Sequence, residues 1–141
     1  MRFILLMLAA HAFGSQTEWV RKLETGVVKD PDAHHHRSFG VTIARGAYGL
    51  THDAWTEVSD LPWIMAHNRV HAERACALYL DLTYKRLRSK LNRPLTFADV
   101  YAGYRFGASG YLRMGGRITS MPASFQKKMR DYHVLYQPLT K

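Results

Sequence analysis

The sequence has little cysteine, no repeats and no long apolar run. Cys76 is the single cysteine in 141 residues, so an internal disulfide is excluded and the fold must rest on packing. The apolar run Phe3–Ala10 is about half the length of a membrane-spanning helix, which needs roughly 20 residues, so we expect no stable membrane span. There is no internal repeat and no low-complexity tract, and a chain of this length accommodates one ordinary domain.

Negative charge is also scarce. The chain contains 11 Asp and Glu against 20 Lys and Arg, which gives a formal net charge of +9. Such a chain is attracted to polyanions, among them nucleic acid, anionic lipid and acidic cell-wall polymers, and net charge alone does not choose among these partners.

A basic nucleic-acid-binding module is therefore one alternative. Two groups of cations could neutralise phosphates, namely Arg86, Arg88, Lys90 and Arg93, and then Lys127, Lys128 and Arg130. These charges are scattered over expected helix ends and outer faces, and no zinc-finger, homeodomain or ribonucleoprotein pattern accompanies them. We therefore do not expect nucleic acid to be the partner.

The N-terminus has the layout of a secretory signal peptide. Arg2 precedes the apolar run, and the small-residue pattern Ala10-His11-Ala12 follows it, which predicts a signal peptide at residues 1–12 with cleavage after Ala12. The prediction implies a periplasmic or secreted protein. A short buried N-terminal helix is the alternative interpretation.

Most of the remaining sequence indicates helices. Ser15 to Glu18 has the form of a capping box, and the helix behind it should end at Gly26, with this glycine in a left-handed conformation. From Val27 to Ile43 we expect a loop followed by a short strand or extended segment. We then expect a short helix over Asp53–Val58, with Thr51 as its cap and Pro62 preventing its continuation, and a long helix over Met65–Leu91.

Two further helices are expected near the C-terminus. Thr96 to Asp99 has the form of a cap, and four large side chains share a stripe behind it: Phe97, Val100, Tyr101 and Tyr104. Gly103 and Gly107 interrupt this helix, which indicates the close approach of a ligand or of another part of the protein. A last helix carries Phe125, Met129, Tyr132 and Tyr136 on one face. The predicted fold class is mostly α (α+β), one helical domain with a small irregular or β segment between the first two helices.

Three short blocks occur in a fixed order along this pattern. They are Glu24-Thr25-Gly26, then Gly46-Ala47-Tyr48-Gly49-Leu50-Thr51, then Gly103-Tyr104-Arg105-Phe106-Gly107. Their order and separations resemble the signature blocks of the soluble lytic transglycosylases, a group of goose-type lysozyme-like enzymes. The resemblance covers most of the chain after residue 15 and implies a lysozyme-like transglycosylase domain at residues 15–137.

The resemblance implies a reaction and a set of site residues. Glu24 would be the catalytic acid that cleaves the glycosidic bond between N-acetylmuramic acid and N-acetylglucosamine in peptidoglycan, without a cofactor. Tyr104 would contact and orient the glutamate. The expected substrate-binding residues are Thr25, Gly46, Tyr48, Gly49, Leu50, His52 and Arg105. Gly46 and Gly49 suit this role because a bare backbone lets a saccharide approach closely.

One acid is sufficient for this chemistry. Ordinary glycosidases need a second carboxylate as nucleophile or base, and Asp30, Asp32, Asp53 and Glu57 stand in no recognisable motif for that role. In the transglycosylase scheme the substrate's own hydroxyl closes an anhydro ring, so the acid alone is enough.

The chain departs from the family pattern at two positions. Thr51-His52 replaces the usual Met-Gln, and Arg105 replaces an asparagine. An amide both donates and accepts hydrogen bonds, whereas arginine only donates. A noncatalytic cell-wall-binding relative is therefore the second alternative. Both a catalytic and a noncatalytic protein of this kind could act as a component of a secretion, conjugation or phage complex.

The histidines do not form a recognisable metal motif. His34, His35 and His36 are consecutive, and neighbours in an extended segment point to opposite sides, so we expect a solvated loop without a metal. His67 and His71 are four apart on the predicted long helix, where surface histidines or a glycan contact are favoured over chelation. Cys76 lies on the apolar face of the same helix and should be a buried small hydrophobe.

Overall fold

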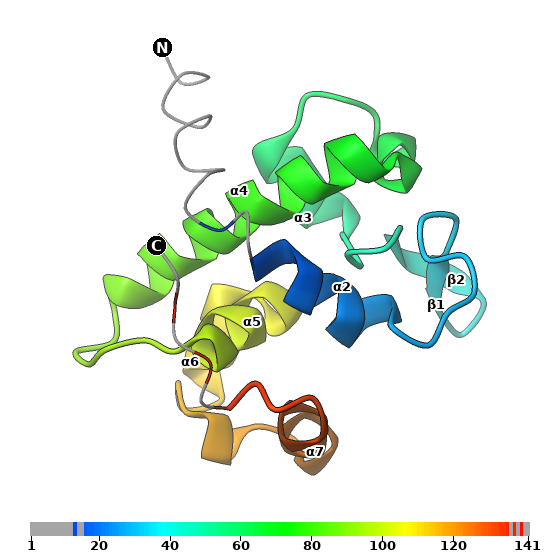
Figure 1. Ribbon diagram of the computed structural model, residues 1–141. Coiled ribbons are helices and arrows are strands. Elements are labelled where there is room, and N and C mark those ends of the chain that lie inside the picture. Colours follow the sequence, from blue (N-terminus) through cyan, green and yellow to red (C-terminus); the bar gives the residue numbers. More distant parts are fainter. Residues whose placement is uncertain (1–12, 14–15, 136, 138, 140–141) are drawn as a thin grey trace. The chain divides into compact units, whose positions relative to one another are not determined.

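The computed structural model describes residues 13, 16–135, 137 and 139. The predicted signal peptide, Ser15 of the predicted capping box and Tyr136 of the predicted last helix lie outside these residues. The described chain is mostly helical, with a two-stranded antiparallel sheet between the helices labelled α2 and α3 in Figure 1, so the predicted fold class is confirmed. The described part contains no helix long and apolar enough to cross a bilayer.

The chain divides into two compact units, residues 1–79 and 80–141. The first unit contains α2 (Thr17–Thr25), β1 (His35–Ser38), β2 (Val41–Arg45), α3 (His52–Val58), the 3-10 helix η2 (Trp63–His67) and the first part of α4 (Arg69–Arg88). The second unit contains the rest of α4, followed by α5 (Phe97–Phe106), α6 (Ala108–Arg113), the 3-10 helix η3 (Ile118–Ser120) and α7 (Ala123–Asp131).

Helix α2 forms where the sequence predicts it. Val20 and Leu23 are buried, and the helix ends before Gly26. The predicted left-handed conformation of Gly26 is wrong, because its φ of −59° and ψ of −24° are those of a right-handed helix. Glycine suits this position for another reason: a Cβ on Gly26 would lie 2.5 Å from the Lys22 carbonyl oxygen.

The strands β1 and β2 form a hairpin. Ser38 pairs with Val41 next to the turn, and the register shifts between His36 and Arg37. The two turn residues, Phe39 and Gly40, have φ angles of +50° and +78°. Positive φ at both positions is the geometry of a type I′ turn, whose twist matches that of the strands.

One predicted helix boundary is confirmed and another differs from the structure. Thr51 caps α3 as expected, accepting a hydrogen bond from the Ala54 amide at 3.1 Å, and the helix ends at Val58, the last residue of the predicted helix. The predicted helix over Met65–Leu91 is split, because Asn68 is extended and its side chain accepts from the His71 amide at 3.2 Å. His67 therefore belongs to η2 and His71 to α4, so the prediction that they share one helix is wrong.

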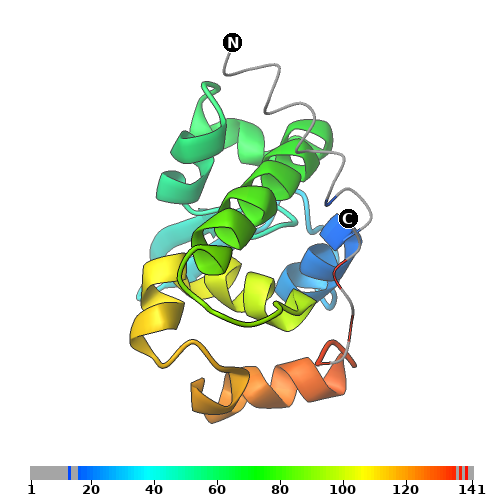
Figure 2. The ribbon, with the colours of Figure 1, turned by 90° about the vertical axis from the view of Figure 1, so that its left-hand side faces the viewer.

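The core of the second unit is built on α5, with aromatic residues at its centre. Tyr101 stacks on Phe97, on Tyr104 and on Phe125 of α7, with ring centroids 6.3, 6.3 and 5.8 Å apart. Both ribbon views accordingly show α5 and α7 as neighbouring helices (Figures 1 and 2). The predicted apolar stripe of α5 is thus confirmed. Tyr132 follows the end of α7.

Gly103 and Gly107 have different roles. A Cβ on Gly103 would lie 2.5 Å from the Thr83 side chain, so this glycine allows α5 to pack closely against α4. Gly103 does not interrupt α5, contrary to the prediction. Gly107 ends the helix with a φ of +77°, a conformation that favours glycine.

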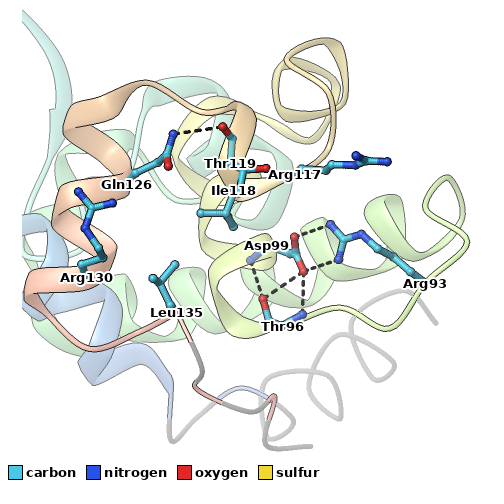
Figure 3. A pocket seen from close by; sticks show the side chains of 9 residues that line it. All are labelled: Arg93, Thr96, Asp99, Arg117, Ile118, Thr119, Gln126, Arg130 and Leu135. Carbon is cyan, nitrogen blue, oxygen red and sulfur yellow. Dashed lines mark hydrogen bonds and ion pairs between the residues drawn. The ribbon is translucent and has the colours of Figure 1, made fainter.

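A buried carboxylate organises the second unit (Figure 3). Asp99 is 2% exposed and accepts two hydrogen bonds from Arg93, at 2.8 and 2.9 Å. It also accepts from the Thr96 amide at 2.8 Å, which completes the predicted capping box, and from the Tyr111 hydroxyl at 2.6 Å. Arg93 in turn donates to the Gly116 carbonyl at 2.6 Å. This network fixes the start of α5 to the segment after α6.

The same network makes the stability of the second unit depend on pH. Burial alone would raise the pKa of Asp99, but the hydrogen bonds from Arg93, Thr96 and Tyr111 outweigh it and lower the pKa below its ordinary value. A group with a lowered pKa in the folded state stabilises the fold above its unfolded pKa, about 3.9 for aspartate, and loses that contribution as the pH falls through the folded pKa.

We predict that Asp99→Asn lowers the free energy of unfolding by about 1–3 kcal/mol near neutral pH, because the buried position loses its charge-assisted hydrogen bonds from Arg93, whose partly exposed charge is then solvated by water. Urea unfolding near neutral pH and below about pH 3 measures the effect, and the difference between wild type and variant should shrink in acid. Asp131→Asn, which removes an exposed ion pair with Lys127 on α7, is the control and should cost at most about 1 kcal/mol. A difference that stays constant with pH would contradict the prediction.

Candidate active site

The second sequence block forms a tight loop directly after β2. Arg45 and Leu50 exchange backbone hydrogen bonds of 3.0 and 3.1 Å, so the four residues between them are closed into a turn. Gly46 has a φ of +76°, and a Cβ there would lie 2.0 Å from the Ala66 carbonyl oxygen. Gly46 is therefore required by the packing of this loop against η2.

A hydrogen bond joins the first block to this loop. The Thr25 hydroxyl donates to the Ala47 carbonyl at 2.8 Å and also lies 3.1 Å from the carbonyl of Arg21 on its own helix. Thr25 is 2% exposed, so its hydroxyl is used inside the fold. The end of α2 and the second block are consequently fixed to each other, although 22 residues separate them in sequence. Contact of Thr25 with substrate stays a prediction.

Glu24 lies against the same loop. A Cβ built on Gly49 would be 2.5 Å from Glu24 Oε2 and 2.9 Å from its carboxyl carbon, and Gly49 has a φ of +60°. A side chain at position 49 would therefore displace the carboxylate. Glu24 itself is half-buried, so part of its side chain remains open to solvent. The first unit thus brings together Glu24, Thr25, Gly46 and Gly49, as the motif order predicts.

Tyr48 points into the first unit. It is fully buried, and burial together with the negative charge of Glu73 raises the pKa of Tyr48 to about 12. The positive charge of Arg69 at the start of α4 counteracts this rise, and Arg69 also donates to Glu18 of α2 at 3.0 Å. The buried Tyr48 ring anchors the loop in the core of the first unit, and a role in contacting substrate stays a prediction.

A tryptophan that the motif does not mark completes this region. Trp63 of η2 donates from its indole nitrogen to the Leu50 carbonyl at 2.9 Å, and the Arg45 guanidinium lies 4.3 Å from its ring centroid. The exposed ring of His52 meets Trp63 edge-on, with centroids 5.4 Å apart. The sequence signal for Trp63 is weak, because it lies 12 residues beyond the end of the second block.

The remaining predicted residues belong to the second unit. Tyr104 is buried on α5 and stacks with Tyr101, whereas Arg105 is exposed in the last turn of the same helix. Their predicted roles beside Glu24 stay predictions.

The consecutive histidines lie in two different environments. His34 is in the loop before β1, whereas His35 and His36 lie in β1 and are half-buried, contrary to the prediction of a solvated loop. His36 donates from Nε2 to the Gly46 carbonyl at 3.0 Å, while the ring of His35 lies 4.5 Å from that of His67. Alternation along the strand explains why these neighbours have different partners. Among the described residues, no three potential metal-ligating side chains are grouped suitably for a metal ion.

The second unit contains a separate open pocket of about 660 Å³ (Figure 3). Ile118 of η3 and Leu135 point into its middle, while Arg130 of α7 lies to one side and Arg117 to the other. Arg93 and Asp99 also line it, but their charges compensate each other. None of the predicted site residues lines this pocket.

Comparisons with family models, with curated proteins and with solved structures give no match. The resemblance to the lytic transglycosylases therefore rests on the three sequence blocks, and the geometry of the first unit stands beside it as an independent observation.

We predict that Gly49→Ala impairs the site through Glu24. The added methyl group would overlap the Glu24 carboxylate and must displace it. The peptidoglycan clearing that the family resemblance implies should therefore fall by at least about tenfold, in line with the cost of a small misplacement of a reacting group.

Gly40→Ala is the matched control, because Gly40 also has a positive φ, +78°, but a Cβ there has no neighbour within 4 Å. Both variants carry the same kind of backbone strain, about 1 kcal/mol. Equal clearing rates for the two variants, corrected for their thermal stability, would show that the contact with Glu24 is irrelevant.

Proposed function

We propose that this protein is a peptidoglycan-cleaving lytic transglycosylase in which Glu24 is the single catalytic acid. The observation that carries the proposal is the contact between the first two blocks. The Glu24 carboxylate lies against Gly49, and the neighbouring Thr25 hydroxyl donates a hydrogen bond to the Ala47 carbonyl. Two short motifs that resemble those of the transglycosylases thus meet at one carboxylate.

The position of Glu24 suits acid catalysis. It is at the end of a helix whose inner face is fixed by Val20 and Leu23, so its backbone is held by the core. The close approach of Gly49 restricts the orientation of the carboxylate, and the half-exposed side chain can still reach a bound ligand. A general acid must be fixed in this way to within hydrogen-bond reach of the oxygen that it protonates.

The proposed reaction uses Glu24 twice. Protonated Glu24 donates its proton to the glycosidic oxygen as the bond between that oxygen and the sugar carbon breaks. The resulting carboxylate then accepts the proton of the substrate's own hydroxyl while that oxygen attacks the sugar carbon and closes the anhydro ring. The second proton transfer restores the acid, so the cycle needs neither a second carboxylate nor a cofactor.

The groups beside the loop suggest how sugar is held. Trp63 and His52 present an aromatic ring and an imidazole next to Leu50, and amphipathic rings of this kind supply both apolar contact and hydrogen bonds. In this proposal they take over the role of the amide that the family pattern has at position 52. Arg105 is proposed to donate to the glycan where the family has an asparagine, and Tyr104 to orient Glu24.

We predict that Glu24→Gln abolishes the clearing of purified peptidoglycan, with a loss of at least about a thousandfold, because glutamine has no proton of suitable acidity to give. Turbidity measures the rate, and co-sedimentation with peptidoglycan measures binding, which should be retained. Glu57→Gln, the same change on an exposed residue of α3, should clear at the wild-type rate.

The two readouts separate the alternatives. Unchanged clearing by Glu24→Gln would refute the assignment of the acid. If wild type and variant both bind the wall and neither clears it, the protein is a noncatalytic wall-binding component.

The products distinguish the two possible reactions. Mass analysis of the released muropeptides should find anhydro sugar ends, which are lighter than the hydrolysed ends by one water molecule. Reducing ends alone would mean that water, rather than the substrate's hydroxyl, captures the sugar.

A further inference from the structure

The hairpin exposes its largest apolar side chains. Phe39 is 105% exposed, Val41 64% and Ile43 49%, and they are close together at the turn and along β2. We call these three residues the apolar tip. Large apolar groups gathered in this way on a water-soluble surface indicate a binding surface more strongly than single exposed residues do.

The backbone of Phe39 is also in an unfavourable conformation. It is one of two non-glycine residues with a positive φ in the described chain, and it occupies a turn position where asparagine or aspartate is favoured. A bulky residue in this conformation is strained. The Phe39 ring is not packed in the core, so no burial offsets its strain. Both the strain and the exposure are explained if the ring binds something outside the chain.

The charge around the tip favours an anionic partner. From Ala33 to His52 the sequence contains Arg37 and Arg45 and no Asp or Glu. Arg37 is exposed on β1 close to the turn and forms no ion pair with any residue that the structure describes. A cation beside exposed apolar side chains is the arrangement that suits the interface of an anionic bilayer, where apolar groups enter the acyl boundary and cations stay among the headgroups.

The size of the tip distinguishes a bilayer from a folded protein partner. One fully exposed aromatic ring and two partly exposed aliphatic side chains offer roughly 300–400 Å², about half of what each partner buries in a stable protein complex. A bilayer needs no complementary shape and accepts a narrow tip.

We propose that the apolar tip is a peripheral membrane-binding site that inserts Phe39 into the interface of an anionic lipid bilayer while Arg37 contacts the headgroups. The site is independent of the proposed catalytic activity. It attaches the first unit to a membrane surface without a membrane-spanning helix.

The decisive variant is Phe39→Asn. Asparagine is favoured at this turn position, so the variant should be as thermally stable as the wild type or more so, and loss of binding cannot be ascribed to unfolding. In co-sedimentation with vesicles that mix phosphatidylglycerol and phosphatidylcholine, the full chain should lose roughly tenfold or more of its affinity. An unchanged affinity would overturn the proposal.

The charge contribution is tested separately. Arg37→Gln should weaken binding to the mixed vesicles roughly fivefold, with little effect on vesicles of phosphatidylcholine alone. Arg117→Gln, the same change on an exposed residue of the second unit, is the control. Equal effects of the two variants would mean that net charge, rather than the tip, attracts the protein, and would overturn the proposal.

A nitroxide label reports where the bilayer is contacted, which matters because the apolar run Phe3–Ala10 of the full chain is itself attracted to lipid. The label is attached at Val41→Cys or, as a control, at the exposed Thr56→Cys on α3, while the native Cys76 is buried. When vesicles are added, the label at position 41 should collide more often with oxygen, which is concentrated in the bilayer, and less often with a water-soluble nickel complex. The collision rates at position 56 should not change. The same response at both positions, or self-association through the tip measured by sedimentation without lipid, would overturn the proposal.

Discussion

The arrangement of the first unit depends on two places where glycine lets other atoms come unusually close. At Gly46 the neighbour is the Ala66 carbonyl, and at Gly49 it is the carboxylate of Glu24. Both glycines also have positive φ angles, so the loop conformation and the close approach require the same residue type. With a side chain at position 46 the second block would have to move away from η2, and with one at position 49 the Glu24 carboxylate would be displaced. The pattern Gly-x-x-Gly is thus a packing requirement of this fold, whatever ligand it binds.

Much of the fold follows from local signals in the sequence. The cap at Thr51, the capping box from Thr96 to Asp99 and the end of α2 at Gly26 are all found in the structure, because each depends on hydrogen bonds within one turn of a helix. Features that depend on residues distant in sequence are not predicted by these local signals. Gly103 reads as an interruption of α5 in sequence, but its role is set by Thr83, a residue of a different helix. The break at Asn68 has a local cause, the cap that its side chain forms with the His71 amide, but the apolar pattern on both sides of it conceals the break.

Part of the candidate site follows from the order of the motifs. This order places Glu24 and Gly49 in one predicted site, and in the structure the Glu24 carboxylate lies against Gly49, whereas the roles of the other site residues stay predictions. The order of the motifs does not reveal Trp63, because its proximity to Leu50 and His52 results from the turn after α3. The motif also does not reveal that the Tyr48 ring is buried, because an aromatic residue between two glycines is equally compatible with a buried and an exposed ring. The strained, exposed Phe39 is likewise visible only when φ and exposure are known together.

Asp99 and Glu24 are carboxylates at the ends of helices, and they show how the same chemical group is suited to different tasks. Asp99, at the start of α5, accepts hydrogen bonds from Arg93, from the Thr96 amide and from Tyr111, so its oxygens are saturated and its charge is compensated. Such a carboxylate stabilises the fold. Glu24, at the end of α2, lies against Gly49 and remains partly open to solvent. An acid that must give and retake a proton needs a fixed position together with access for its substrate. The partial exposure of Glu24 is therefore what suits it, rather than the buried Asp99, to the proposed chemistry.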